Sequence, residues 1–159
     1  MIERSKHYYD KDRNLPYKEN TKETLRYFTL SEFDCNCGGE NCKGDKMDKD
    51  FLIKLDEARH LANQSFQINS GMRCNDYQED LRRRGYKTAK KDSPKYKASK
   101  TSAHLDGLAA DISVTDSRSR WIVLNSLLLA GFVRIGIADT FIHVDLAKAN
   151  KTQNCVWTY

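Results

Sequence analysis

The chain has 159 residues, of which 39% are hydrophobic and 31% are charged, and its formal net charge is +5 at pH 7. With only two prolines and eight glycines, this composition excludes a disordered or low-complexity chain. One domain is the simplest organisation, because a single core of this size buries roughly two thirds of the unfolded surface. The positive charge indicates an anionic partner and leaves three kinds open: nucleic acid, an acidic polysaccharide and a membrane surface.

The segment 1–26 is densely charged and has little apolar periodicity, so we interpret it as an N-terminal extension. It contains no apolar h-region, and no run of about 18 apolar residues occurs in the chain. We therefore expect neither a signal peptide nor a membrane segment. The compact domain is expected over 27–159.

The five cysteines are an odd set, and reduced thiols are the default without a signal peptide. Three of them lie within eight residues, at Cys35, Cys37 and Cys42. A fourth ligand would complete a structural zinc site. The candidates for it are Cys74, Cys155 and His60. A disulfide and small thiols packed in a tight loop are the alternatives, and the sequence leaves them open.

The first half of the domain predicts a helix followed by a strand. Segment 50–63 carries apolar residues at helical spacing, with Asp48 or Asp50 as its N-cap. Segment 65–71 alternates apolar and polar residues and ends in Ser-Gly, which is typical of a strand that enters a turn.

A short helix and a long loop come next. Segment 75–85 predicts a helix that Asn75 caps and Gly85 ends. Segment 86–100 holds six lysines and almost no large aliphatic residue, so it predicts a loop. That loop is either a solvated surface or a lid or anionic-polymer contact.

The second half predicts a strand, a helix and two further strands. The expected ranges are 109–114, 116–131, 132–138 and 140–147. Asp116 or Ser117 caps the helix and Gly131 ends it. The last two strands are expected to form a hairpin.

Alternation along these strands separates a core face from a polar face. Ile112, Ile135 and Ile142 fall on the core face. If the strands share a sheet, the opposite face carries a common set of polar residues. That set is Asp111, Arg134, His143 and Asp145.

Two residue types on this polar face, histidine and aspartate, are ones that bind metal ions. Catalytic zinc takes three histidine or carboxylate ligands and leaves one position open. His104, Asp111 and His143 would form such a set, with Gly107 allowing the turn that returns His104 to the strand. The alternative for a single strand histidine is a structural hydrogen bond.

Three motifs, in this order, resemble the zinc D-alanyl-D-alanine peptidases. They are "SGMRC" at 70–74, "SAHLDGLAADI" at 102–112 and "FIHVDL" at 141–146. The likeness is to the branch of D-alanyl-D-alanine carboxypeptidases and phage-encoded cell-wall peptidases, and "FTLSEFDCNCG" and "CVWTY" extend it over 27–159. It implies the α+β fold shared with the hedgehog signalling domain, a small antiparallel sheet with helices on one side and zinc on its polar face.

The resemblance also implies roles for individual residues. His104, Asp111 and His143 fall on the zinc ligands of the family. Arg73 falls on the arginine that polarises the scissile carbonyl or stabilises the oxyanion. We expect Ser102 to lie near the substrate or to hydrogen-bond next to the metal site.

The chain departs from the family at the general base. Many members carry an acid three residues before the last zinc histidine, and Thr140 occupies that position. Asp139 or Asp145 could replace the base, or Asp145 could orient a ligand instead.

The function that follows is a zinc-dependent hydrolase, a metallopeptidase that cuts an amide bond in peptidoglycan stem peptides or cross-links. It would be a phage-type cell-wall lysin or endolysin, monomeric, in the cytoplasm of an infected bacterium or in the virion. We do not expect it to bind nucleic acid, because no basic stripe is interleaved with aromatic residues. The alternative is a zinc-stabilised, non-catalytic binding or virion structural module.

Overall fold

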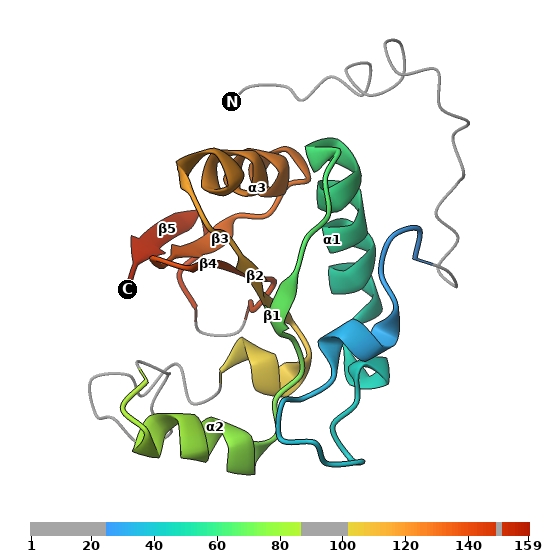
Figure 1. Cartoon of the computed structure of the whole chain (residues 1–159), viewed down its shortest axis with the longest axis vertical. Helices are drawn as coiled ribbons and strands as arrows, with labels where there is room; N and C mark the ends of the chain where they lie inside the picture. The colour runs from blue at the N-terminus through green and yellow to red at the C-terminus, as the bar shows by residue number, and fades with distance from the viewer. Residues whose placement is uncertain (1–24, 87–101, 149–150) are drawn as a thin grey trace.

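The computed structural model describes residues 25–86, 102–148 and 151–159, which form an α+β fold (Figure 1). Its sheet has five strands in the order β1-β2-β4-β3-β5. The strands are β1 (Ile68–Ser70), β2 (Ala109–Ser113), β3 (Arg134–Ile137), β4 (Phe141–Asp145) and β5 (Cys155–Thr158). The helices are α1 (Lys49–Ala62), α2 (Asn75–Arg83) and α3 (Ser117–Leu129), with short 3-10 helices η2 (Leu30–Phe33), η3 (Gly44–Lys46) and η5 (Ala103–Asp106).

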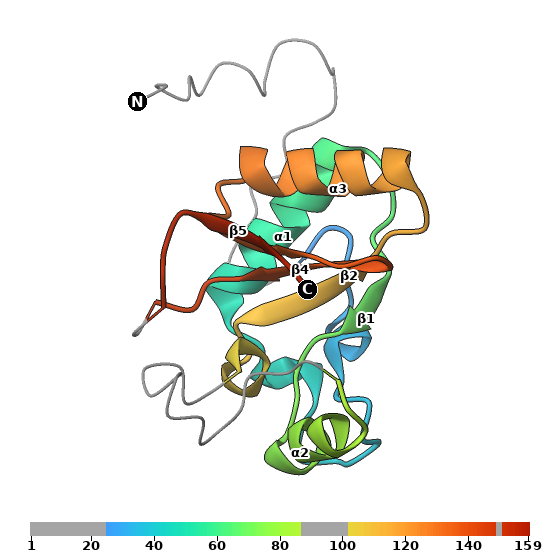
Figure 2. The same ribbon diagram turned by 90° about the vertical axis from the view of Figure 1, so that its left-hand side faces the viewer.

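The sheet is mixed, which corrects the antiparallel sheet expected from the sequence. β1, β2, β4 and β3 pair antiparallel, whereas β5 pairs parallel with β3. Figure 2 shows the sheet with β1 at one edge and β5 at the other. Because β3 and β4 form a hairpin, β4 ends on the side of the sheet where β3 begins. β5 follows β4 in the chain and pairs with the free edge of β3. It therefore starts on that same side of the sheet and runs parallel to β3. From the sequence, no strand was expected over these last residues.

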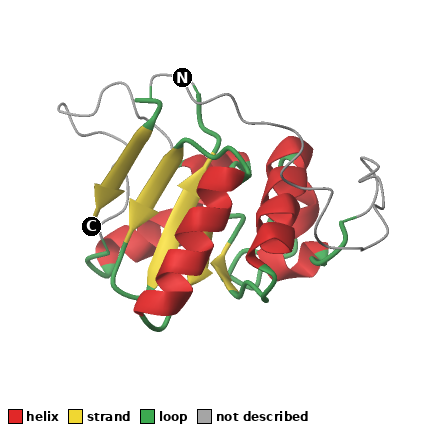
Figure 3. Ribbon diagram, turned by 90° about the horizontal axis from the view of Figure 1, so that it is seen from above, coloured by secondary structure: helices red, strands yellow, loops and turns green. Residues whose placement is uncertain are grey.

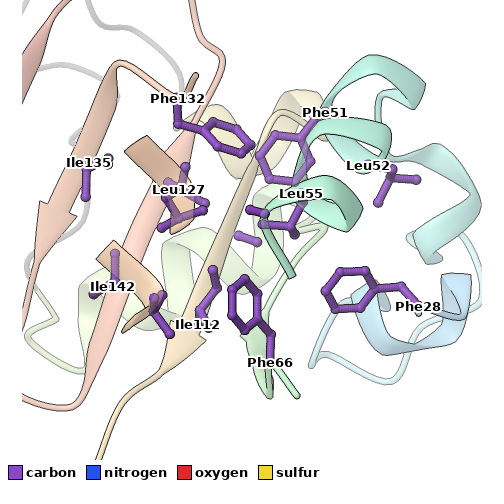
Figure 4. Close-up of a cluster of buried hydrophobic side chains, with 14 of the residues drawn as sticks. Phe28, Phe51, Leu52, Leu55, Phe66, Ile112, Leu127, Phe132, Ile135 and Ile142 are labelled. Carbon is purple, nitrogen blue, oxygen red and sulfur yellow. The ribbon is translucent and has the colours of Figure 1, made fainter. Parts of the chain in front are cut away.

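The hydrophobic core lies between one face of the sheet and the helices α1 and α3 (Figure 4). Ile112, Ile135 and Ile142 are fully buried in it, as the alternation of the strands predicts. The helices contribute Phe51, Leu52, Leu55, Val123 and Leu127. The opposite face of the sheet is therefore free to carry the polar residues.

Helix caps follow the sequence with one exception. The side chain of Asp48 accepts a hydrogen bond from the Phe51 N–H, and Asp116 caps α3 in the same way. At α2 the N-cap is Cys74 rather than Asn75, because the Cys74 Sγ accepts from the Tyr77 N–H.

Helix α2 also corrects the expectation that the helices lie on one side of the sheet. It lies at the end of the molecule opposite α3 (Figure 3 shows the α1 and α3 layer from above). Its buried residues, Gln78 and Leu81, are not members of the main core cluster. From this position, α2 contributes residues to a cavity on the polar side of the fold.

The folded part of the described chain includes two residues that the sequence assigned to the N-terminal extension. Leu25 packs against the core, and the Arg26 guanidinium pairs with Asp56 at 3.0 Å and with Glu57 at 2.6 Å. Asp56 is fully buried and also accepts from the Tyr27 N–H. This carboxylate therefore fixes the start of the domain to α1.

The rest of the extension, 1–24, lies outside the described residues, as do 87–100 of the lysine-rich segment. Among the helices that the structure describes, none combines the length and the apolar composition needed to cross a membrane.

Asp56→Ala is expected to lower the free energy of unfolding by about 3 kcal/mol, because it leaves the Arg26 guanidinium and the Tyr27 N–H without their buried acceptor. Glu57→Ala is the matched control, since Glu57 is more exposed, and should cost less than about 1 kcal/mol. Urea unfolding measures both changes. Equal losses from the two variants would contradict the role given to Asp56.

Candidate metal centre

Three residues converge on the polar face of the sheet: His104, Asp111 and His143. Asp111 of β2 lies directly opposite His143 of β4 in the antiparallel register. His104 comes from η5, just before β2. One potential ligand atom from each lies within 4.8 Å of the others, and each residue is less than a tenth exposed. The structure thus brings together the ligand set expected from the sequence.

Gly107 makes the return from His104 to β2 sterically feasible, as expected from the sequence. It ends η5 in the left-handed region at φ 67°. Its carbonyl accepts from the Asp48 N–H at 3.0 Å, so the backbone passes very close to the start of α1. A Cβ at this position would lie 2.5 Å from the Lys46 carbonyl oxygen. Glycine is required here by both conformation and space.

The outer nitrogen of each histidine is held by an oxygen acceptor. The Nδ1 of His104 lies 2.7 Å from the Gly71 carbonyl, so this nitrogen carries the proton. The Nε2 of His143 lies 3.0 Å from the Asp145 Oδ2, which likewise places the proton there. The inner nitrogens, Nε2 of His104 and Nδ1 of His143, both point toward Asp111, and each offers a lone pair to a metal ion when it carries no proton.

Both inner nitrogens face the same carboxylate oxygen. The Oδ1 of Asp111 lies 3.3 Å from His104 Nε2 and 2.9 Å from His143 Nδ1. Three acceptor atoms this close together repel one another unless a proton or a metal ion lies between them. Two imidazole nitrogens and one carboxylate oxygen are a donor set that catalytic zinc sites use, so the residues fit that ion.

Burial and charge set the protonation of this group. Burial lowers the pKa of His104, which keeps its imidazole neutral near pH 7. Burial also opposes a charge on His143, but hydrogen bonds to Asp111 and Asp145 outweigh it and raise the pKa of His143. For Asp111, burial disfavours ionisation, yet the two histidines outweigh it and hold its pKa well below the usual range.

Arg73 is tied to the metal centre through Asp111. Its Nη2 donates to the Asp111 Oδ2 at 2.6 Å, which leaves Oδ1 to the histidines. Its Nε donates to the Ser70 hydroxyl at 2.8 Å and its Nη1 to Gln78 Oε1 at 3.4 Å. The sequence placed Arg73 near the metal but did not anticipate that it would orient a ligand.

Asp145 is fully engaged by neighbouring donors. One oxygen accepts from the Arg134 Nε at 2.7 Å and the Ala147 N–H at 2.9 Å, and the other from His143. Burial alone would raise its pKa, but His143 and Arg134 outweigh it and lower the pKa of Asp145 to about 2. Such a carboxylate orients His143 well and is a weak proton acceptor.

The structure does not bring the other candidate base to the centre. Asp139 and Thr140 are exposed in the turn between β3 and β4. The Asp139 carbonyl accepts from Arg120 Nη2, and neither turn residue lines the cavity that contains the metal centre.

That cavity has a volume of about 540 Å³ and opens over the polar face. Ser102 lines it, as expected, and its side chain makes no cap hydrogen bond to η5. Among its other lining residues are Gln78 and Leu81 of α2, Arg134, Trp157 and Tyr159.

Gln78 and Trp157 are among the lining residues that were not expected from the sequence. The Nε2 of Gln78 is buried and has no hydrogen-bond partner among the described residues. The ring of Trp157 lies 5.6 Å from that of His143, over Gly136, where a Cβ would lie 2.7 Å from the indole. The alternation of large residues in "CVWTY" was the signal available for Trp157.

A second group of residues could also hold a metal. The Sγ atoms of Cys35, Cys37, Cys42 and Cys74 all lie within 4.8 Å of one another. Of the three candidates for a fourth ligand, the structure therefore selects Cys74. His60 instead bonds the Tyr27 hydroxyl at 2.6 Å, and the Cys155 thiol lies near Arg134.

Comparison with known proteins identifies no relative. No protein-family model, no curated protein and no solved structure matches the chain.

Gly107→Ala is expected to destabilise the fold and weaken metal binding, because the new Cβ pushes η5 and His104 away from Asp111. Gly85→Ala is the matched control, since Gly85 also has a positive φ, of 85°, but open space around it. The control should cost about 1 kcal/mol and leave metal affinity unchanged. Urea unfolding and zinc titration separate the two effects, and equal zinc affinity in both variants would contradict this steric role.

Proposed function

We propose that the chain is a zinc-dependent peptidase that hydrolyses an amide bond in peptidoglycan stem peptides or cross-links. The observation that carries the proposal is the convergence of His104, Asp111 and His143 in a cavity that also holds an arginine. The substrate class rests on the resemblance of three ordered motifs to zinc D-alanyl-D-alanine peptidases. A net charge of +5 is compatible with an anionic cell wall.

His104 Nε2, Asp111 Oδ1 and His143 Nδ1 would hold the ion. Zinc in such a site lowers the pKa of a bound water and acts as a Lewis acid toward a carbonyl. The Gly71 carbonyl and Asp145 hold the outer nitrogens, which orients both rings with their inner nitrogens toward the ion.

Arg73 would stabilise negative charge on the scissile carbonyl. Its hydrogen bonds to Ser70, Gln78 and Asp111 use one N–H each, whereas a guanidinium carries five. Two N–H groups therefore remain for a substrate that enters the cavity. Because the guanidinium is buried and already held by three acceptors, it needs little reorganisation as charge develops.

Gln78 and Ser102 would orient the substrate peptide. The Gln78 amide is more than nine tenths buried and lines the cavity, and its Nε2 lacks a partner among the described residues. An unmet buried donor is costly, and a peptide carbonyl would satisfy it. The Ser102 hydroxyl also lines the cavity and can donate or accept.

A binding or virion structural module that zinc stabilises without catalysis is the second candidate. The hydrogen bonding of the carboxylates in the cavity favours this second candidate. Besides the ligand Asp111, Asp145 is the one described carboxylate that lines the cavity, and it is held by Arg134 and His143. In a peptidase, Asp145 would have to exchange one of these bonds to accept a proton from water.

The first experiment assays the purified, zinc-loaded chain on peptidoglycan, with mass spectrometry of the released muropeptides. The wild type is expected to cut a peptide bond, and His104→Ala is expected to bind no zinc at this centre and to cut nothing. Stoichiometric zinc at this centre with no cleavage of any muropeptide would support the module instead. Cleavage by His104→Ala at the wild-type rate would overturn both candidates.

The second experiment compares Asp145→Asn with Asp139→Asn. If Asp145 is the base, its variant keeps zinc but loses about 10²-fold or more in kcat. If it orients His143, zinc affinity falls about 10- to 100-fold and excess zinc restores much of the activity. Its bonds to Arg134 and His143 lead us to expect the second result, with Asp139→Asn close to wild type.

A further inference from the structure

The four cysteines of the second group are arranged at the spacing of a tetrahedral metal site. Cys35 Sγ lies 3.9 Å from Cys74 Sγ, and Cys37 Sγ lies 3.1 Å from Cys42 Sγ. A zinc–sulfur bond of about 2.3 Å gives a sulfur–sulfur edge of about 3.8 Å in a regular tetrahedron. Small side-chain shifts would therefore bring all four sulfurs into coordination.

Backbone N–H groups point at two of the sulfurs. The Gly39 N–H donates to Cys37 Sγ at 3.2 Å, and the Tyr77 N–H donates to Cys74 Sγ at 3.4 Å. Such donors, one of them at the N-terminus of α2, stabilise thiolates, the form of cysteine that binds metals. Gly39 also gives the loop room to pass the sulfurs, since a Cβ there would lie 3.3 Å from Cys37 Sγ.

Packing of apolar side chains does not account for the loop that carries the first three cysteines. Within 36–43, Cys42 is the one buried residue, and the residues around it are exposed or half-buried. The backbone closes the loop with a bond from the Cys35 N–H to the Cys42 carbonyl at 2.9 Å. A segment with so little core needs another source of order, and a metal ion provides it.

We propose that Cys35, Cys37, Cys42 and Cys74 bind a second zinc ion with a structural role. Four cysteine ligands leave no open position for water or substrate, so this ion stabilises the fold rather than taking part in hydrolysis. The site is separate from the His104 centre and does not depend on the peptidase proposal.

Through Cys74, this zinc would also stabilise residues that line the cavity. Cys74 follows Arg73 directly and caps α2, which carries Gln78. Asn36, in the loop that carries the first three cysteines, also contacts the segment before Cys74, because its side chain donates to the Asn69 carbonyl at 2.9 Å. The ion would join the loop to the segment that carries Arg73 and so hold that guanidinium against Asp111.

The test measures zinc per chain by elemental analysis, on full-length protein purified under reducing conditions. Wild type and Cys155→Ser, the matched cysteine control, should each bind two zinc ions. His104→Ala, Cys74→Ser and Cys37→Ser should each bind one. Cys37 is exposed, so its variant keeps the test valid if Cys74→Ser fails to fold, which circular dichroism would show.

X-ray absorption identifies the ligands of the zinc that remains. In His104→Ala it should show four sulfurs at about 2.3 Å, and in Cys37→Ser only nitrogen and oxygen ligands at about 2.0–2.2 Å. Absence of zinc from folded His104→Ala would overturn the inference, as would a denatured chain with fewer than five free thiols, which indicates a disulfide. Zinc that persists in His104→Ala but is absent from Cys37→Ser would support the inference and reject only the His104 centre.

Discussion

The buried carboxylate of Asp111 is the group around which the polar side of the fold is organised. One of its oxygens accepts from Arg73 at 2.6 Å, and the other faces His104 and His143. A carboxylate with so little exposure needs positive charge close by, because burial alone disfavours its ionised form. The guanidinium supplies part of that charge, and a cation between the histidines would supply the rest.

The antiparallel register of β2 and β4 is what makes this arrangement possible. It places Asp111 opposite His143 and, two residues along, Ala109 opposite Asp145. The same register turns Ile112 and Ile142 into the core beneath α1 and α3. A slip by one residue would bury the ionisable groups in the core and expose the isoleucines, so the core and the candidate metal centre stabilise each other's register.

The segment 69–74 connects the two groups of potential metal ligands. The Gly71 carbonyl holds His104, and Gly71 itself lies so close to Phe33 that a Cβ would come within 2.7 Å of the Phe33 Cα. Arg73 reaches Asp111, and Cys74 joins the cysteine group. Small displacements of this segment would therefore alter a histidine, an arginine and a thiolate together, which is why stabilising it matters for the cavity.

The sequence by itself determined what depends on local pattern: the helices, the strands β1 to β4, the polar face and the set His104, Asp111 and His143. Alternation and turn chemistry act over a few residues, so they are visible without a fold. Only the tertiary structure decided the parallel pairing of β5, the choice of Cys74, the contact of Arg73 with Asp111 and the exclusion of Asp139 from the cavity. Each of these depends on residues that are distant in the chain or on the direction of a turn, and chain order alone does not specify such distances.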